Sequence, residues 1–156
     1  MEKVRRVISV IVANEAQVLS RVSGLFAGRG YNIDSLTVAP IPDTDLSHMT
    51  IVTRGNKRVI EQITKQLHKL IPTFKVIEHT EMVEKEMVLI KFPISEKLSD
   101  IQALSSAYNG GIVNVGVDFI IAMAADDSNR ISHFIDASKR FHPIEIVRSG
   151  VVAMER

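Results

Sequence analysis

The same order of segments (strand, helix, strand, strand, helix, strand) occurs twice along this chain of 156 residues. Strands are predicted where apolar and β-branched residues run together, and helices where apolar residues recur every three or four positions. The first set is 7–13, 14–28, 31–39, 48–54, 56–70 and 74–77, and the second is 86–92, 95–108, 111–117, 118–125, 128–141 and 144–152. This repeat predicts an α+β protein of two tandem ferredoxin-like (βαββαβ) units, residues 1–80 and 81–156.

Each predicted unit has no more than about 80 residues, which is small for an independent core. In such a unit two helices cover one face of a four-stranded antiparallel sheet, and the other face needs a cover of its own. The strands at Ile8–Val12 and Val88–Phe92 carry apolar residues at adjacent positions, so both of their faces are partly apolar. We therefore expect the units to pair, either within the chain or across a two-fold dimer.

Composition excludes or disfavours several classes of function. The chain has no cysteine, which excludes disulfides, thiolate catalysis and cysteine metal sites. Its net charge of +1 argues against a nucleic-acid binder, because such proteins need a clustered basic face. The longest apolar runs, 7–13 and 119–125, are far shorter than the roughly 18 residues of a membrane helix, and no signal-peptide pattern occurs. We expect a cytoplasmic protein that binds neither nucleic acid nor membrane.

Residue types used in catalysis are present without the spacing that catalysis needs. The five histidines include no H-x-x-x-H pair, which favours solvated or capping roles over metal ligation. Ser20 and Ser149 lack a G-x-S-x-G setting. Gly24, Gly28 and Gly30 fall within and after a predicted helix, whereas a phosphate-binding glycine loop precedes one. An independent enzyme is therefore not expected, and neither catalytic nor metal-binding residues are assigned.

The start of the first predicted helix is the best candidate for a ligand site. Asn14 is expected to be its N-cap, with Gln17 three positions later completing a variant of the capping box. Some backbone N–H groups of the first turn stay free and carry the positive end of the helix dipole, so a small carboxylate could bind there. The helix is expected to end at Gly28 to Gly30, where a glycine takes the left-handed conformation.

Five segments together resemble the small, regulatory subunit of acetolactate synthase, the enzyme that opens branched-chain amino-acid synthesis. They are NEAQVLSRVSGLFAGRGYNIDSLTVAP (14–40), SHMTIV (47–52), QLHKL (66–70), VLIKF (88–92) and VRSGVVAM (147–154). The resemblance implies that residues 1–80 form an effector-binding, dimerising ACT domain and that 81–156 form the C-terminal domain of the small subunit. It also implies a homodimer that binds and activates a separate catalytic subunit, which carries thiamine diphosphate, FAD and magnesium, whereas this chain carries no cofactor.

The resemblance further implies that an end-product amino acid, usually valine, binds where two ACT domains meet. The loop ending at Asn14, with Gln17 and the amides near Val18 and Leu19, would take the carboxylate. Asn32 and Ile33 of the partner chain would line the other side of the ligand. The ligand's aliphatic side chain would need an apolar wall, and Ile33, Leu36 and Val38 on the following strand are the candidates. Asparagine suits a zwitterion, because its side chain both donates and accepts hydrogen bonds.

Two positions depart from the family pattern. Gln17 stands where glycine is common, and its side chain could crowd the pocket or fold back to cap Asn14. We therefore predict valine binding that is weaker or of altered selectivity. His48 stands where arginine is more frequent. A different class of function is also kept open: a free-standing amino-acid-sensing module that regulates another enzyme or a transcription factor.

Overall fold

The computed structural model describes residues 4–70 and 73–156. The chain forms two compact units, the first made of residues 1–83 together with 151–156 and the second of residues 84–150. These compact units differ from the predicted division after residue 80 in that the last six residues pack with the first unit. Their place in the first unit depends on contacts between residues far apart in the sequence, and no local pattern reports such contacts.

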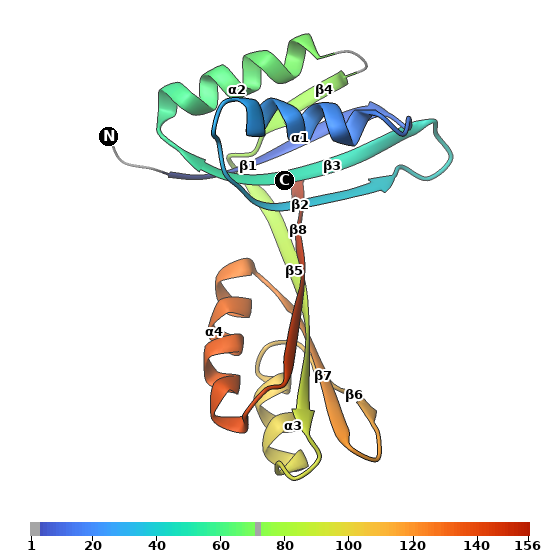
Figure 1. Ribbon diagram of the computed structural model, residues 1–156, viewed down its shortest axis with the longest axis vertical. Helices are drawn as coiled ribbons and strands as arrows, with labels where there is room; N and C mark the ends of the chain where they lie inside the picture. Colours follow the sequence, from blue (N-terminus) through green and yellow to red (C-terminus); the bar gives the residue numbers. More distant parts are fainter. Residues whose placement is uncertain (1–3, 71–72) are drawn as a thin grey trace. The chain divides into compact units, whose positions relative to one another are not determined.

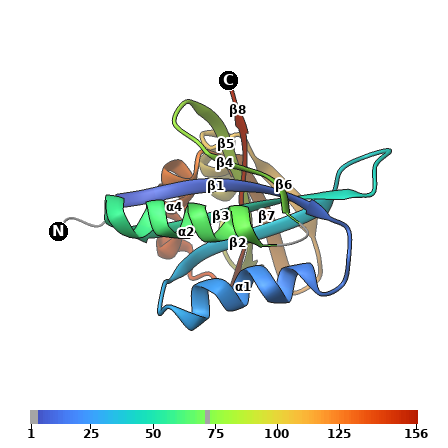
Figure 2. The ribbon, with the colours of Figure 1, turned by 90° about the horizontal axis from the view of Figure 1, so that it is seen from above.

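The first unit has the predicted βαββαβ order. Its elements are β1 (Val4–Ala13), α1 (Val18–Gly28), β2 (Ile33–Pro40), β3 (Leu46–Gly55), α2 (Lys57–Lys69) and β4 (Thr73–Glu78). The four strands form an antiparallel sheet in the order β2-β3-β1-β4, which leaves β2 and β4 at the edges. Both helices lie on the same face of this sheet (Figures 1 and 2).

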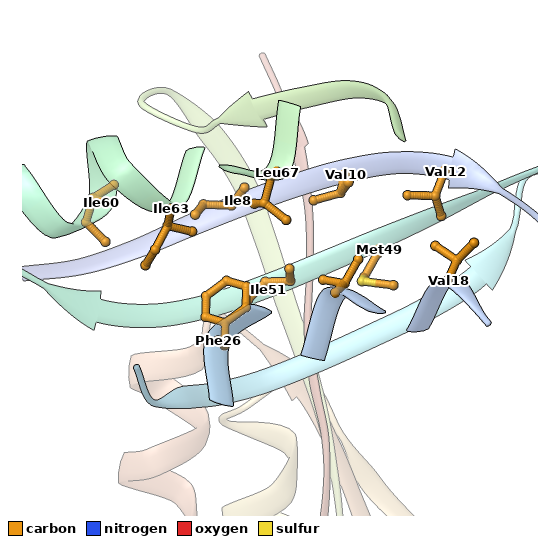
Figure 3. Packing of buried hydrophobic residues seen from close by; sticks show 11 residues of the cluster. Ile8, Val10, Val12, Val18, Phe26, Met49, Ile51, Ile60, Ile63 and Leu67 are labelled. Atoms are coloured by element: carbon orange, nitrogen blue, oxygen red, sulfur yellow. The ribbon is translucent and has the colours of Figure 1, made fainter. Parts of the chain in front are cut away.

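The core of the first unit lies between that face and the two helices. Alternate residues of β1 and β3 point toward the helices, because successive side chains of a strand point to opposite faces. Figure 3 shows how side chains of α1 and α2 meet those of the strands. The buried cluster consists of Ile8, Val10, Val12, Val18, Val22, Phe26, Met49, Ile51, Ile60, Ile63 and Leu67.

The ends of both helices follow from local sequence signals. Gly30 has a φ of +70°, the N–H of Tyr31 donates to the carbonyl of Phe26, and the N–H of Gly30 donates to Ala27. These bonds form a Schellman motif, as the glycine pattern predicts. At the start of α2, the Asn56 side chain accepts from the N–H of Val59 at 2.9 Å.

The opposite face of the first sheet is covered by the end of the last strand, β8 (Glu145–Glu155). We call residues 151–156 the C-terminal segment. Val151 and Ala153 are buried in a second small cluster with Val7 and Val52. The expected need for a cover on this face is therefore met, at least in part, by the chain itself.

The second unit repeats the arrangement. Its remaining elements are β5 (Met82–Pro93), α3 (Leu98–Ser106), β6 (Gly111–Val115), β7 (Phe119–Asp126), α4 (Ser128–Ser138) and a short 3₁₀ helix, Lys139–Phe141. The sheet order is β6-β7-β5-β8, and the buried cluster includes Val88, Ile90, Phe92, Ile131 and Phe134. Both strands β5 and β8 are longer than predicted, since each extends into residues of the first unit.

Candidate functional site

The loop between β1 and α1 differs from the predicted capping box. Helix α1 begins at Val18, its N-cap is Gln17, and no side chain caps it. The N–H of Asn14 donates to the carbonyl of Asp45 at 2.8 Å, so Asn14 still continues the pairing of β1 with β3. Residues 15–17 then connect this end of the strand to the first residue of the helix. The prediction that Asn14 caps the helix is therefore wrong, because its hydrogen bond to Asp45 holds Asn14 at the end of β1, away from the start of the helix.

Free backbone donors are nevertheless present in the first turn of α1. The N–H of Val18 is occupied, since it donates to the carbonyl of Glu15 at 3.2 Å, and the N–H of Arg21 donates to Gln17 at 3.1 Å. The N–H groups of Leu19 and Ser20 have no acceptor among the described residues. Two donors at the positive end of a helix dipole are available for a small anion.

The other predicted site residues lie on or before the edge strand β2. Asn32 is exposed, and its carbonyl accepts from the Thr53 hydroxyl at 2.6 Å. Ile33 and Leu36 are half-buried against the helix-side core, and Val38 is 44% exposed. A bulge between residues 33 and 35 shifts the register, which lets Ile33, Leu36 and Val38 share one face although they are not spaced by two.

One chain does not bring these two groups together. Asn14 and Asn32 flank opposite ends of α1, whose 11 residues span about 16 Å at 1.5 Å per residue. Asn14, Gln17 and Leu19 lie near the start of the helix, whereas Asn32 and Ile33 lie beyond its end. A site that uses both groups therefore needs a second copy of the chain. The buried side chain of Val18 is part of the core and does not face solvent.

A polar network that the sequence did not reveal lies on the sheet face away from the helices. The Ser9 hydroxyl is 2.8 Å from Nε2 of His48 and 2.6 Å from Nε2 of His79. Nδ1 of His79 is 2.7 Å from Oε2 of Glu155 in the C-terminal segment. His79 is buried, so the expectation that the histidines are solvated or capping is wrong for this residue. Sheet register brings these residues together, and no short motif could have reported them.

Serine, histidine and glutamate are joined here in the order used by serine hydrolases, but the surroundings do not suit catalysis. Ser9 is 0% exposed, so no substrate can reach its hydroxyl. Glu155 lies in the C-terminal segment, so removing that segment to admit a substrate would also remove the acid. The network is therefore a buried hydrogen-bond chain and not a nucleophilic site.

Two groups of the network have shifted acidity. The pKa of His48 is lowered, chiefly because burial disfavours the charged ring and secondly because His79 lies nearby. The pKa of Glu155 is lowered, chiefly by its hydrogen bond with His79. The network thus favours a neutral His48 and an ionised Glu155.

The second unit contains a cluster of charges with a structural role. Asp126 is buried and accepts from Nε of Arg130 at 2.5 Å and from the Asn109 side chain at 3.1 Å. Arg130 also donates to the carbonyl of Ala107, just after α3, at 2.6 Å. The hydrogen bond from Arg130 to the Asp126 carboxylate is the first cause of the lowered pKa of Asp126. The cluster holds α3 to α4, and the described residues contain no group of three or more side chains suited to a metal.

Comparison with known proteins gives consistent matches over nearly the whole chain. Residues 8–75 match the family model of the AHAS small subunit-like ACT domain, and residues 85–156 match that of the small subunit of acetolactate synthase. The chain is 44% identical over 154 residues to the probable acetolactate synthase small subunit of Archaeoglobus fulgidus, covering 97% of each chain. It is 42% identical to the acetolactate synthase isozyme 3 small subunit of Escherichia coli, covering 97% of this chain and 96% of that one.

A solved structure extends the match to the fold. The crystal structure of the acetolactate synthase small subunit from Thermotoga maritima superposes with a TM-score of 0.89 at 34% identity, covering 98% of each chain. The predicted fold class, two tandem βαββαβ units of which the first is an ACT domain, is confirmed. Among the described residues, no helix is long and apolar enough to cross a membrane.

Proposed function

This chain belongs to the family of acetolactate synthase small subunits, and from that premise we propose that it activates the catalytic subunit and makes it sensitive to valine. The catalytic subunit would hold the thiamine diphosphate, FAD and magnesium, and this chain would hold none of them. The chemistry would take place on the partner, and this chain would change the partner's conformational equilibrium through a bound effector.

The single observation that carries the effector site is the pair of free N–H groups at the start of α1. Leu19 and Ser20 offer two donors without acceptors among the described residues, at the end of the helix where the dipole favours an anion. The α-carboxylate of an amino acid fits such a site. The donors are thus one position later than the amides of Val18 and Leu19 that the family resemblance implies, because the Val18 N–H is already bonded to Glu15.

A second copy of the chain would complete the pocket. Asn32 and Ile33 of that copy would lie opposite Asn14 and Leu19, since one chain holds these groups at opposite ends of α1. The edge position of β2 supports such pairing, because an edge strand has unpaired backbone groups that a two-fold related strand can satisfy. The site would then exist in the homodimer and not in the separated chain.

The side chain of the effector would contact apolar residues of β2. Val38 is 44% exposed, and Ile33 and Leu36 are half-buried on the same face. This wall suits a short branched aliphatic group better than a charged or long one. Gln17 caps nothing in the structure, so its side chain is available to enter the pocket, which supports valine binding that is weaker or of altered selectivity.

The proposal is tested by calorimetric titration of valine into the purified chain, with leucine, isoleucine and threonine as comparisons. Saturable valine binding at one or two sites per dimer is expected. The same preparation is then added to an acetolactate synthase catalytic subunit, whose activity should rise and become sensitive to valine. Effector and catalytic partner should be coupled by about 1 to 3 kcal/mol. A chain that binds valine but neither activates nor copurifies with a thiamine-dependent subunit would favour the free-standing sensor.

A further inference from the structure

The turn between α3 and β6 (Figure 1) contains Asn109 followed by Gly110, the one asparagine–glycine pair in the sequence. An asparagine loses its side-chain amide when the backbone nitrogen of the next residue attacks its carbonyl carbon Cγ. A glycine at that next position leaves the attack least hindered, because it has no side chain. The other asparagines, Asn14, Asn32, Asn56, Asn114 and Asn129, each precede a residue with a side chain. Asn109 is therefore the position most susceptible to deamidation in the unfolded chain.

The fold itself requires both residues of this pair. Asn109 has a φ of +58°, and its N–H donates to the carbonyl of Ser106 at 3.4 Å, while the N–H of Gly110 donates to that of Ser105 at 2.9 Å. These bonds end α3 in a Schellman motif, in which asparagine tolerates the left-handed position. A Cβ atom at Gly110 would overlap the carbonyl oxygen of Met123 in β7, so the next residue must be glycine.

The same contacts prevent the reaction in the folded unit. Attack closes a five-membered ring, which needs the Gly110 nitrogen and the Asn109 Cβ on the same side of the Asn109 Cα–C bond. In the left-handed conformation of Asn109 they lie on nearly opposite sides. The Gly110 N–H is also bonded to Ser105, and Nδ2 of Asn109 donates to Oδ2 of Asp126 at 3.1 Å. Ring closure therefore needs the turn to open first.

A carboxylate at position 109 would not fit the closed turn. Asp126 is 4% exposed, and its pKa is lowered, first by its hydrogen bond from Arg130, so its carboxylate is ionised at neutral pH. Deamidation would replace the donor Nδ2 of Asn109 by an anion beside this buried charge. Arg130 is already engaged, since it donates both to Asp126 and to the carbonyl of Ala107.

An isoaspartate at position 109 would fit still less well. It places one more carbon in the backbone immediately before Gly110, where β7 leaves no room even for a Cβ atom. Overpacking of this kind is destabilising. Both products of deamidation therefore oppose closure of the turn.

We propose that Asn109 is a deamidation site protected by the fold: it stays intact while the second unit is closed, reacts when the turn opens, and then prevents the unit from closing again. In the first step the Gly110 nitrogen bonds to Cγ of Asn109, and the proton of Gly110 leaves with the side-chain nitrogen as ammonia. In the second step water opens the cyclic imide at either carbonyl, which gives aspartate or isoaspartate. Water is the only other reactant, and no group is oxidised or reduced. Opening of the second unit thus becomes irreversible with time.

Peptide mapping by mass spectrometry tests the protection on the full chain, incubated at about pH 8 either in buffer or in guanidinium chloride. In denaturant Asn109 should react before the other five asparagines, and isoaspartate should be present, because direct hydrolysis of the amide gives aspartate alone. In buffer the loss of Asn109 should be at least about a hundredfold slower, because only the open fraction reacts. Equal rates in the two solutions overturn the proposal, and so does an unmodified Asn109 in denaturant.

Refolding after incubation in denaturant tests the consequence. Hydrogen-exchange protection of β5 and β7 peptides measures the refolded fraction, which should fall in the wild type in step with the loss of Asn109. In Asn109→Gly this fraction should not fall, because glycine accepts the left-handed conformation and has no amide to lose. Asn129→Ala, at an exposed position of α4, is the matched control and should behave as wild type. A wild-type chain that is fully deamidated at position 109 and still refolds overturns the proposal.

The product made by mutation provides an independent readout. Asn109→Asp should lower the urea midpoint of the second unit in freshly prepared protein, before any chemical change has occurred, because its carboxylate faces Asp126. A midpoint equal to that of the wild type would contradict the proposed effect of deamidation.

Discussion

The hydroxyl of Thr37 donates to the carbonyl of Val151 at 2.7 Å, which joins two residues 114 positions apart in the sequence. Beside it, the N–H of Val151 meets the Ser35 hydroxyl at 3.4 Å. Both side chains come from β2, the edge strand that also carries the apolar residues of the proposed effector site. The strand thus has one face toward the helix-side core and the other against the C-terminal segment.

Thr37→Val should destabilise the first unit by about 1 kcal/mol, because it leaves the Val151 carbonyl without this donor while nearly preserving shape. Urea unfolding of the full chain measures the change. The matched control is Thr64→Val, since the Thr64 hydroxyl bonds to Ile60 within its own helix, and such back-bonding adds little to stability. Equal effects of the two substitutions would contradict the prediction.

Gly110→Ala should destabilise the second unit strongly. A Cβ atom at Gly110 would lie 1.8 Å from the carbonyl oxygen of Met123, and neither backbone can move without disturbing β7. We expect a loss of about 3 kcal/mol or more, at the upper end of overpacking effects. Thermal and urea unfolding provide the measurement.

Gly24→Ala is the control for that substitution and should have the opposite sign. A Cβ at Gly24, inside α1, meets nothing within 4 Å. Alanine should therefore stabilise the chain by about 0.5 to 1 kcal/mol through helix propensity. Destabilisation by both substitutions to a similar extent would show that the close approach at Gly110 is not the cause.

Asp126→Asn should flatten the acid end of the stability profile. The pKa of Asp126 is lowered in the folded chain, first by its bond with Arg130. The ionised carboxylate therefore adds to the free energy of unfolding above pH 3.8, the usual pKa, and this stabilisation is lost as the pH falls through the lowered pKa. The asparagine variant should lose about 1 to 3 kcal/mol at pH 7, because a charged hydrogen bond at a buried residue is weakened. Unfolding between pH 2 and pH 7 compares the two chains, and parallel profiles would contradict this assignment.

Gln17→Gly should tighten valine binding or broaden selectivity without a loss of stability. Gln17 makes no capping bond, and glycine is acceptable at an N-cap. The measurement is calorimetric titration with valine and leucine, accompanied by urea unfolding. Unchanged affinity and unchanged selectivity would show that the Gln17 side chain stays outside the pocket.

A fragment of residues 1–80 should be less stable and less soluble than the first unit within the full chain. Truncation removes the C-terminal segment and exposes Val7 and Val52, which are 1% and 2% exposed in the intact chain. Sedimentation and urea unfolding measure the effect. The double substitution Val7→Thr and Val52→Thr should restore solubility to the fragment, in which these side chains face solvent. The same substitutions should destabilise the full chain, in which these side chains are buried. A fragment as soluble as the full chain would contradict this expectation.

Local signals determined most of the fold from the sequence. Gly30 marks the end of α1 and Asn56 the start of α2, because a left-handed glycine and a capping asparagine act within a few residues. The apolar periods predicted all twelve main elements in the right order. The resemblance around Asn14 to Pro40 supplied the family, and the comparisons confirm it.

Tertiary structure alone decided three further features. Asn14 does not cap α1, because its N–H donates to the carbonyl of Asp45, a residue just before β3 and more than thirty positions away in the sequence. The C-terminal segment belongs to the first unit, because Val7 and Val52 offer it an apolar surface. Ser9, His48, His79 and Glu155 form one network only after the register of β1, β3 and β4 is set. Sequence patterns report interactions within a few residues, whereas these features depend on long-range pairing.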